Sequence, residues 1–199
     1  MAIKPILFNT EMVEAILEGQ KTQTRRTVKQ PPIVGDIMRD EKGWYYEDGT
    51  RNGHSLIPQF STGDILWVRE TWGKLTECDV FPPYEPHEER FIYRADRGDP
   101  DHFQAKWHPS IHMPKEAARI FLRVKDVRVE RLQDMDEDAA IAEGIADSPA
   151  GTDSPLLRFT ELWDKTIRRE DLREFGYHAN PWVWVIEFER CEKPEGWCS

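Results

Sequence analysis

Strand-like segments are spread along the whole chain, and this distribution limits the folds open to it. The strongest segments are 3–8, 65–69, 118–132 and 182–188. Helix-like segments are fewer and shorter, and they do not alternate with the strands as a parallel βαβ sheet requires. The pattern favours an α+β fold, in the form of a mixed β-barrel with helices on its periphery.

The longest strand region, 118–132, contains a break in its alternation. Apolar residues alternate up to Val124, and the alternation resumes out of phase at Val127. Alternate side chains of a strand point to opposite faces, so the change of phase predicts a bulge or bend near Lys125-Asp126.

Helix boundaries are predicted from capping residues and glycines. Asn, Ser and Asp side chains accept hydrogen bonds from the first turn of a helix, and Gly adopts the left-handed conformation that ends one. The predicted starts are Asn9 or Thr10, Asp134 or Asp136, and Ser154-Pro155, and the first two helices are predicted to end at Gly19 and Gly144.

Two stretches, at about 31–60 and 76–115, interrupt the pattern as insertions. The first contains a predicted hairpin around 40–43, and the second is rich in Pro and His with one strand-like segment at 91–93. Long segments of this kind often carry specificity, so we predict a long inserted lid over 76–115.

Histidines in the second insertion raise the alternative of a metal site. His108 and His112 have the spacing of a helical zinc pair, and His102 lies six residues earlier. Pro109 and Pro114 disfavour a regular helix, and no Glu follows His108 as a zincin requires. We therefore favour a polar lid and predict no metal site.

Composition restricts the partners and the compartment. The 199 residues carry a formal net charge of -10 and no run approaches the length of a membrane span. An acidic chain is repelled by duplex DNA, so a small ligand is favoured over a long polyanion. The length is sufficient for one well-buried core, so a single domain over 1–199 is expected. Three Cys without a CxxC pair and an N-terminus without an apolar signal core predict a cytoplasmic location.

A basic stretch follows directly on the first predicted helix. Lys21, Arg25, Arg26 and Lys29 fall within nine residues, and the same stretch holds two Thr hydroxyls beside Lys21. A nucleophile near a base, flanked by guanidinium groups, is one start for a binding or catalytic site. The alternative is a solvated basic loop.

Two other residue types have alternative interpretations. Trp182 and Trp184 share one face of a strand and are expected in the core, whereas Trp67 lies nearer polar segments and can stack on a base. Glu143 ends a predicted helix, where the dipole disfavours an acid, which marks it as a functional candidate or an ordinary exposed Glu.

Several segments of the chain together resemble a known family. The stretch 19–26 is similar to the GxKxxxxR-type signature of the ASCH family, a branch of the PUA-like β-barrels. The segments 62–68 and 182–188 resemble the turn with its strand and the closing strand of that family, in the same order. The segments 107–114 and 180–184 are similar to those of longer, prophage-encoded ASCH proteins of bacteria.

The resemblance implies a PUA-like barrel and a set of site residues. One small bacterial member of the family is an amidohydrolase that removes the acetyl group of N4-acetylcytidine with a Lys, a Thr and a Glu. These residues match Lys21, Thr24 and, across a gap, Glu143, with Glu137 and Asp138 left open as the acid.

The implied activity is therefore a metal-independent amidohydrolase acting on a modified nucleoside or a related small amide, without a cofactor. In a regular strand Lys21 and Thr24 would point to opposite faces, so the segment must turn for both to reach one pocket. The alternative is a non-catalytic module that binds single-stranded RNA or senses a nucleotide, and a phage accessory protein is a third interpretation. The residues expected to contact a ligand are Arg25, Arg26, Thr22 and Trp67.

Overall fold

The capping residues fix the helices where the sequence predicts them. The computed structural model describes residues 1–29, 36–47, 53–75, 90–96, 106–145 and 154–197. Asn9, Asp136 and Ser154 cap α1, α2 and α3, respectively, and each side chain accepts from a backbone amide of the first turn. The helices are α1 (Thr10–Leu17), α2 (Glu137–Ala142), α3 (Pro155–Thr166) and α4 (Leu172–Phe175).

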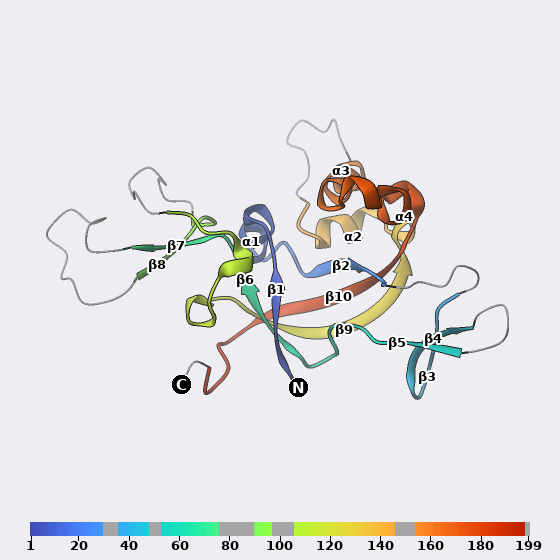
Figure 1. Ribbon diagram of the computed structural model, residues 1–199, viewed down its shortest axis with the longest axis horizontal. Coiled ribbons are helices and arrows are strands. Elements are labelled where there is room, and N and C mark those ends of the chain that lie inside the picture. The colour runs from blue at the N-terminus through green and yellow to red at the C-terminus, as the bar shows by residue number, and fades with distance from the viewer. Residues whose placement is uncertain (30–35, 48–52, 76–89, 97–105, 146–153, 198–199) are drawn as a thin grey trace, which may run out of the picture.

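The strands among the described residues form three separate sheets. The largest has the order β1-β6-β9-β10-β2, in which β1 and β6 are parallel and the other neighbours are antiparallel. Figure 1 shows this sheet crossing the centre of the molecule, with α2, α3 and α4 grouped together beside it. The strands are β1 (Ile3–Leu7), β2 (Gln23–Thr27), β3 (Met38–Asp40), β4 (Gly43–Glu47), β5 (Gly53–Leu56), β6 (Ile65–Arg69), β7 (Trp72–Leu75), β8 (Arg90–Tyr93), β9 (Phe121–Arg131) and β10 (Trp182–Cys191).

The phase break predicted in the long strand is a β-bulge. Glu187 pairs with Asp126, but the next residue of β10, Phe188, pairs with Val124. Lys125 is therefore the extra residue, as the sequence predicts. The bulge lets β9 keep apolar side chains on the core face along its whole length.

β10 is buried on both faces and separates two hydrophobic cores. Trp182 and Trp184 belong to the core that also holds Val13 and Ile16 of α1, which confirms their expected packing role. Val183 and Val185 face the other way, toward α2 and α3. The sheet is thus covered by helices on both sides, and β2 runs along its edge.

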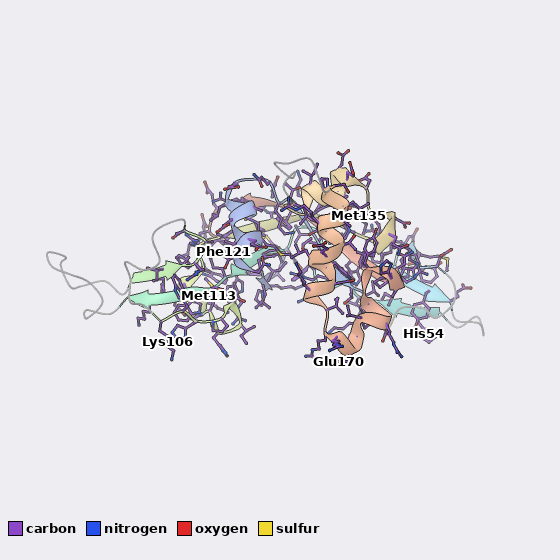
Figure 2. All side chains as sticks on the ribbon, turned by 90° about the horizontal axis from the view of Figure 1, so that it is seen from above. His54, Lys106, Met113, Phe121, Met135 and Glu170 are labelled. Atoms are coloured by element: carbon purple, nitrogen blue, oxygen red, sulfur yellow. The ribbon has the colours of Figure 1, made fainter. Side chains whose placement is uncertain are left out.

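A third cluster lies against β6 and β9 on the side of the β7–β8 hairpin. It contains Trp67, Met113 and Phe121, together with smaller residues from the turn at Lys115–Ala117. Figure 2 shows Met113 and Phe121 at the left of the molecule and Met135, which belongs to the core under α3, at the right.

The two insertions carry the smaller sheets. The hairpin predicted around 40–43 is present as β3 and β4, and β5 extends it to three strands. Trp44 of this sheet packs edge-on against Trp184, at 5.7 Å between ring centroids. The second insertion contributes β8, which includes the strand predicted at 91–93, and the remainder of the expected lid at 76–89 and 97–105 lies outside the described residues.

The backbone ladders of the described residues do not close into a ring, because the large sheet ends at β1 and β2. A side chain links these two edges: Arg26 Nη2 donates to the carbonyl oxygen of Leu7 at 3.0 Å. The fold is therefore a mixed α+β arrangement around a curled sheet. Within the described segments, no helix combines the length and the apolar character needed to cross a membrane.

Candidate functional site

The basic stretch begins where α1 ends. Gly19 has the left-handed φ of 76°, and the amides of Gln20 and Lys21 donate to the carbonyl oxygen of Ala15 at 2.8 and 3.0 Å. This is the helix end predicted from the sequence. It turns the chain before β2 starts, and Lys21 therefore precedes the strand.

The same stretch satisfies the C-terminal carbonyl groups of α2. Carbonyl groups at a helix C-terminus carry partial negative charge, and the last of them lack partners inside the helix. Ala139 O has such a partner, the amide of Glu143 at 3.1 Å, whereas the oxygens of Ala142 and Glu143 depend on donors from this stretch. Residues 21, 22 and 23, about 120 positions earlier in the sequence, each donate one hydrogen bond to these carbonyl groups. The contacts are Gln23 Nε2 to Ala139 O at 2.8 Å, Thr22 N to Ala142 O at 2.8 Å, and Lys21 Nζ to Glu143 O at 2.7 Å.

A buried ion pair forms at this junction. Lys21 Nζ also donates to Glu143 Oε2 at 2.7 Å, and Arg25 Nη1 donates to Glu143 Oε1 at 3.1 Å. The side chains of Lys21, Arg25 and Glu143 are 0%, 1% and 5% exposed. The interpretation of 19–26 as a solvated basic loop is wrong for Lys21 and Arg25, because both cations are buried and bonded to the same buried carboxylate.

Burial and neighbouring charges act on Lys21 in opposite directions. Removal of the ammonium from water lowers the pKa of Lys21, and the attraction and hydrogen bond of Glu143 oppose this shift. The positive charges of Arg26 and Arg25 lower the pKa of Lys21 further. The ring of Phe8 lies 5.5 Å from Nζ and provides an apolar wall with favourable cation–π geometry.

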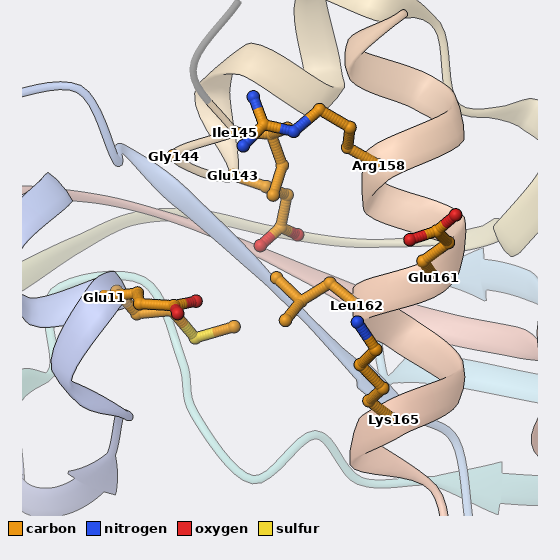
Figure 3. A pocket seen from close by; sticks show the side chains of 9 residues that line it. Glu11, Glu143, Gly144, Ile145, Arg158, Glu161, Leu162 and Lys165 are labelled. Carbon is orange, nitrogen blue, oxygen red and sulfur yellow. The ribbon is translucent and has the colours of Figure 1, made fainter. Parts of the chain in front are cut away.

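Glu143 borders a pocket between α1 and α3. The pocket has a volume of about 400 Å³, within the size range of small-molecule sites. Figure 3 shows the Glu143 carboxylate pointing into this space, with Glu11 on one side and side chains of α3 on the other. The lining residues are Glu11, Met12, Glu143, Gly144, Ile145, Arg158, Glu161, Leu162 and Lys165.

The structure identifies Glu143 as the acid that Lys21 contacts. Glu137 and Asp138, the alternatives left open by the sequence, are exposed in the first turn of α2. They lie at the opposite end of the helix from Glu143. The unfavourable position of Glu143 at a helix C-terminus is compensated by Lys21 and Arg25.

Thr24 lies on the face of β2 opposite Arg25. It pairs with Ile186, whereas Arg25 pairs with Val185, so their side chains point to opposite faces of this edge strand. Thr24 is 1% exposed. Thr22 is exposed just before the strand, where its backbone amide contacts α2.

The remaining predicted ligand contacts have different surroundings. Arg26 is half-buried over the Phe8 ring at 5.6 Å and bonds Leu7. Trp67 is 5% exposed and packs at 5.6 Å from Trp197, in the third cluster and not in the pocket lining. The structure thus joins Lys21, Arg25 and Glu143, and it places Trp67 elsewhere.

Sequence reasoning missed the wall that α3 gives to the pocket. Arg158, Glu161 and Lys165 recur at helical spacing on the face opposite the buried Phe159 and Trp163. Such a row ordinarily indicates a solvated helix face, and the pattern contains no sign that α1 lies across from it.

Neither His108 nor His112, which were considered as metal ligands, lines this pocket. The His108 ring stacks on Trp72 at 4.9 Å, and His112 ends a short 3₁₀ turn. His102 lies outside the described residues. In the described segments, no group of three or more His, Cys, Asp or Glu has metal-binding geometry.

Comparison with known proteins gives one similar solved structure. No family model and no curated protein matches the chain. The chain is similar to the crystal structure of an ASCH domain from Lactobacillus crispatus JV V101, with 13% sequence identity and a TM-score of 0.44. The match covers 95% of this chain and 79% of that chain.

Proposed function

We propose that the protein is an amidohydrolase acting on a small amide of a modified nucleoside, such as N4-acetylcytidine. The observation that supports this proposal is the buried Lys21–Glu143 pair, at 2.7 Å, whose carboxylate faces a pocket of about 400 Å³. A buried charge pair is costly to maintain. Such pairs at the base of a pocket are candidates for proton transfer.

The proposed reaction uses Thr24, Lys21 and Glu143 as one unit. Thr24 Oγ attacks the amide carbonyl carbon, and its proton passes through Glu143 to the leaving nitrogen as the C–N bond breaks. Lys21 carries three protons, two of which bond Glu143, and the third stabilises the oxyanion. Water then cleaves the Thr24 ester, which releases the carboxylic acid and returns the proton to Thr24.

This mechanism requires access to an inner position. Thr24 is 1% exposed, is not part of the pocket lining and points to the face of β2 opposite Arg25, so the reaction requires that its hydroxyl become accessible to the substrate carbonyl. We also propose that the fold is a PUA-like barrel and that the insertion over 76–115 forms a lid.

The direct test is hydrolysis of N4-acetylcytidine and a panel of acylated nucleosides by the purified protein. Lys21→Met, Glu143→Gln and Thr24→Val are each expected to remove most of kcat/KM, with strongly non-additive effects in the double variants. Thr24→Ser retains a nucleophile and is expected to retain activity. Thr22→Ala is the comparison variant and is expected to have a smaller effect than Thr24→Val, since Thr22 is an exposed Thr of the same stretch and has no part in the proposed reaction.

The same experiment separates this proposal from the RNA-binding alternative. Lys21 and Arg25 already bind Glu143, so they are not available to phosphate in the manner of a surface patch. A binding module acting through this stretch would show RNA affinity that falls steeply with salt, and Arg25→Ala with Arg26→Ala would flatten that slope. If RNA affinity behaves in this way and the wild type hydrolyses none of the amides, the RNA-binding alternative would replace the hydrolase proposal.

A further inference from the structure

The Lys21–Glu143 pair is the inner end of a longer chain of alternating charges. Arg25 bonds Glu143 with Nη1 and approaches Glu130 Oε2 with Nη2 at 3.5 Å. Arg128 in turn contacts Glu130 through Nε and Glu187 through Nη1. The members in order are Lys21, Glu143, Arg25, Glu130, Arg128 and Glu187.

Strand register brings this chain together on one face of the sheet. Val185 of β10 pairs with Arg25 on one side and with Arg128 on the other, and Val183 pairs with Glu130. Paired residues share a face, so the charged side chains border the two valines, both fully buried. This is the face covered by α2 and α3 (Figure 1), and Glu143 is the residue that ends α2.

Arg25 divides its guanidinium between two carboxylates. Its side chain is 1% exposed, and its Nε is buried without a hydrogen-bond partner among the described residues. A guanidinium binds a carboxylate best with two parallel N–H groups. The Arg25 guanidinium therefore donates one hydrogen bond to Glu143 through Nη1, while Nη2 faces Glu130. The strength of the bond to Glu143 depends on how strongly Glu130 competes for Arg25.

We infer that Glu130 is a positioning residue for Glu143 that acts through Arg25 and adjusts the ionisation of the pocket carboxylate. Its relevance to catalysis rests on the proposed function, but the coupling itself does not. Glu130 is 26% exposed, so it connects the buried pair with the surface. If the charge of Glu130 is removed, Arg25 interacts with Glu143 only. If Arg25 is removed, Lys21 is the cation that still contacts Glu143.

Several other charged groups face Glu143 and stay in place in this test. Arg26 lies near Lys21 at the edge strand. The groups that α1 and α3 direct to the pocket are Glu11, Arg158, Glu161 and Lys165. Because these groups remain unchanged in each variant, a shift in the titration of Glu143 reports on Arg25 and Glu130.

The experiment is a ¹³C NMR titration of the Glu143 side-chain carboxyl carbon in the full chain. Arg25→Gln is expected to raise the Glu143 midpoint by about one pH unit or more, because an adjacent opposite charge is lost. Glu130→Gln is expected to lower it by a smaller amount. In the Arg25→Gln background, Glu130→Gln should produce little further change, since the intermediary is missing.

Glu189→Gln is the matched control, because Glu189 is an acidic ion-pair partner in the same sheet, paired with Lys125 at 3.3 Å, but it is exposed and, among the described residues, makes no ion pair with the chain of charges that leads to Glu143. The titration midpoint of Glu143 in the Glu189→Gln variant should equal that in the wild type. Equal midpoints in Glu130→Gln and wild type, or an undiminished Glu130→Gln shift in the Arg25→Gln background, would overturn the inference. If Arg25→Gln does not fold, Arg25→Lys takes its place, since it keeps the charge but cannot bridge both acids.

A kinetic readout links the coupling to the proposed reaction. If amides are hydrolysed, the acidic limb of the kcat/KM profile should move to lower pH in Glu130→Gln, in parallel with the NMR midpoint. The titration needs no substrate. Absence of hydrolysis would therefore reject the proposed function and leave the coupling of Glu143, Arg25 and Glu130 to be decided by NMR alone.

Discussion

Glu143 occupies a position that helix electrostatics disfavours, and its neighbours explain why it is retained there. The carbonyl end of α2 already carries partial negative charge. Lys21 bonds both the backbone oxygen and the carboxylate of Glu143, and Arg25 bonds the second carboxylate oxygen. Glu143 thus ends α2, takes part in a buried ion pair and lines the pocket.

Gly144 fixes this geometry at the residue scale. It has a φ of 88°, and a Cβ placed on it would come within 2.8 Å of Ala15 Cβ and 3.0 Å of Lys21 Cβ. Gly144→Ala is expected to reduce the free energy of unfolding by about 1–2 kcal/mol for the left-handed backbone and by about 1–3 kcal/mol more for overpacking. Urea denaturation measures this loss.

Gly63 provides the control for the steric part of that prediction. Its φ of 87° is nearly the same, but a Cβ there would have no atom within 4 Å. Gly63→Ala should therefore show the backbone cost without the overpacking cost. Equal losses in the two variants would show that α2 does not pack against Lys21 as closely as the distances indicate.

At the scale of elements, β8 is tied to the turn before β9 by Tyr93. Its hydroxyl donates to the carbonyl oxygen of Ala117 at 2.6 Å, and the Arg119 guanidinium lies 3.8 Å from its ring centroid. Arg119 also forms a bidentate pair with the buried Glu70 of the segment between β6 and β7. These contacts connect the hairpin of the second insertion with the main sheet.

The hydrogen bond of Tyr93 predicts a pH-dependent contribution to stability. Desolvation raises the pKa of Tyr93 from 10.0 to about 12. A raised folded-state pKa means that the unfolded chain loses the proton first, so the contribution is complete below pH 10 and is lost as the pH rises toward 12. Tyr93→Phe should cost about 1 kcal/mol at pH 8, and its difference from the wild type should narrow above pH 10.

Denaturation of both proteins at several pH values between about 8 and 11.5 checks this expectation. The Arg119 contact with the ring is retained in Tyr93→Phe, so the comparison isolates the hydroxyl. A gap between the two proteins that stays constant or widens above pH 10 would contradict the predicted direction.

At the scale of the whole molecule, stability depends on a sheet that is buried on both faces. Leu66 in β6 is 0% exposed, within the core that joins α1 to the sheet. Leu66→Ala is expected to lower the free energy of unfolding by about 2–5 kcal/mol, through lost burial and the cavity left behind. Leu157 on α3 is 50% exposed, and Leu157→Ala should cost less than about 1 kcal/mol.

Thermal and urea unfolding of the two Leu→Ala variants measures this contrast. The pair keeps the substitution constant and changes only the position. A loss at Leu157 as large as that at Leu66 would indicate that the outer face of α3 is covered in solution by another surface.

Much of the local structure follows from the sequence. The caps at Asn9, Asp136 and Ser154 depend on neighbouring backbone amides, so short-range patterns are sufficient to predict them. The bulge at Lys125 is visible as a change of phase because side chains alternate along a strand whatever it packs against. The basic motif likewise singles out its Lys, Thr and Arg residues by their spacing alone.

The partners of those residues were decided by the tertiary structure. The sequence left three acids for Lys21, and the packing of α2 against β2 places Glu143 beside it and leaves Glu137 and Asp138 exposed. Trp67 looked available to a ligand, but its strand position directs it into the third cluster. Backbone periodicity is a property of neighbouring residues, whereas an ion pair across 122 positions depends on how the whole sheet curls and which helix covers it.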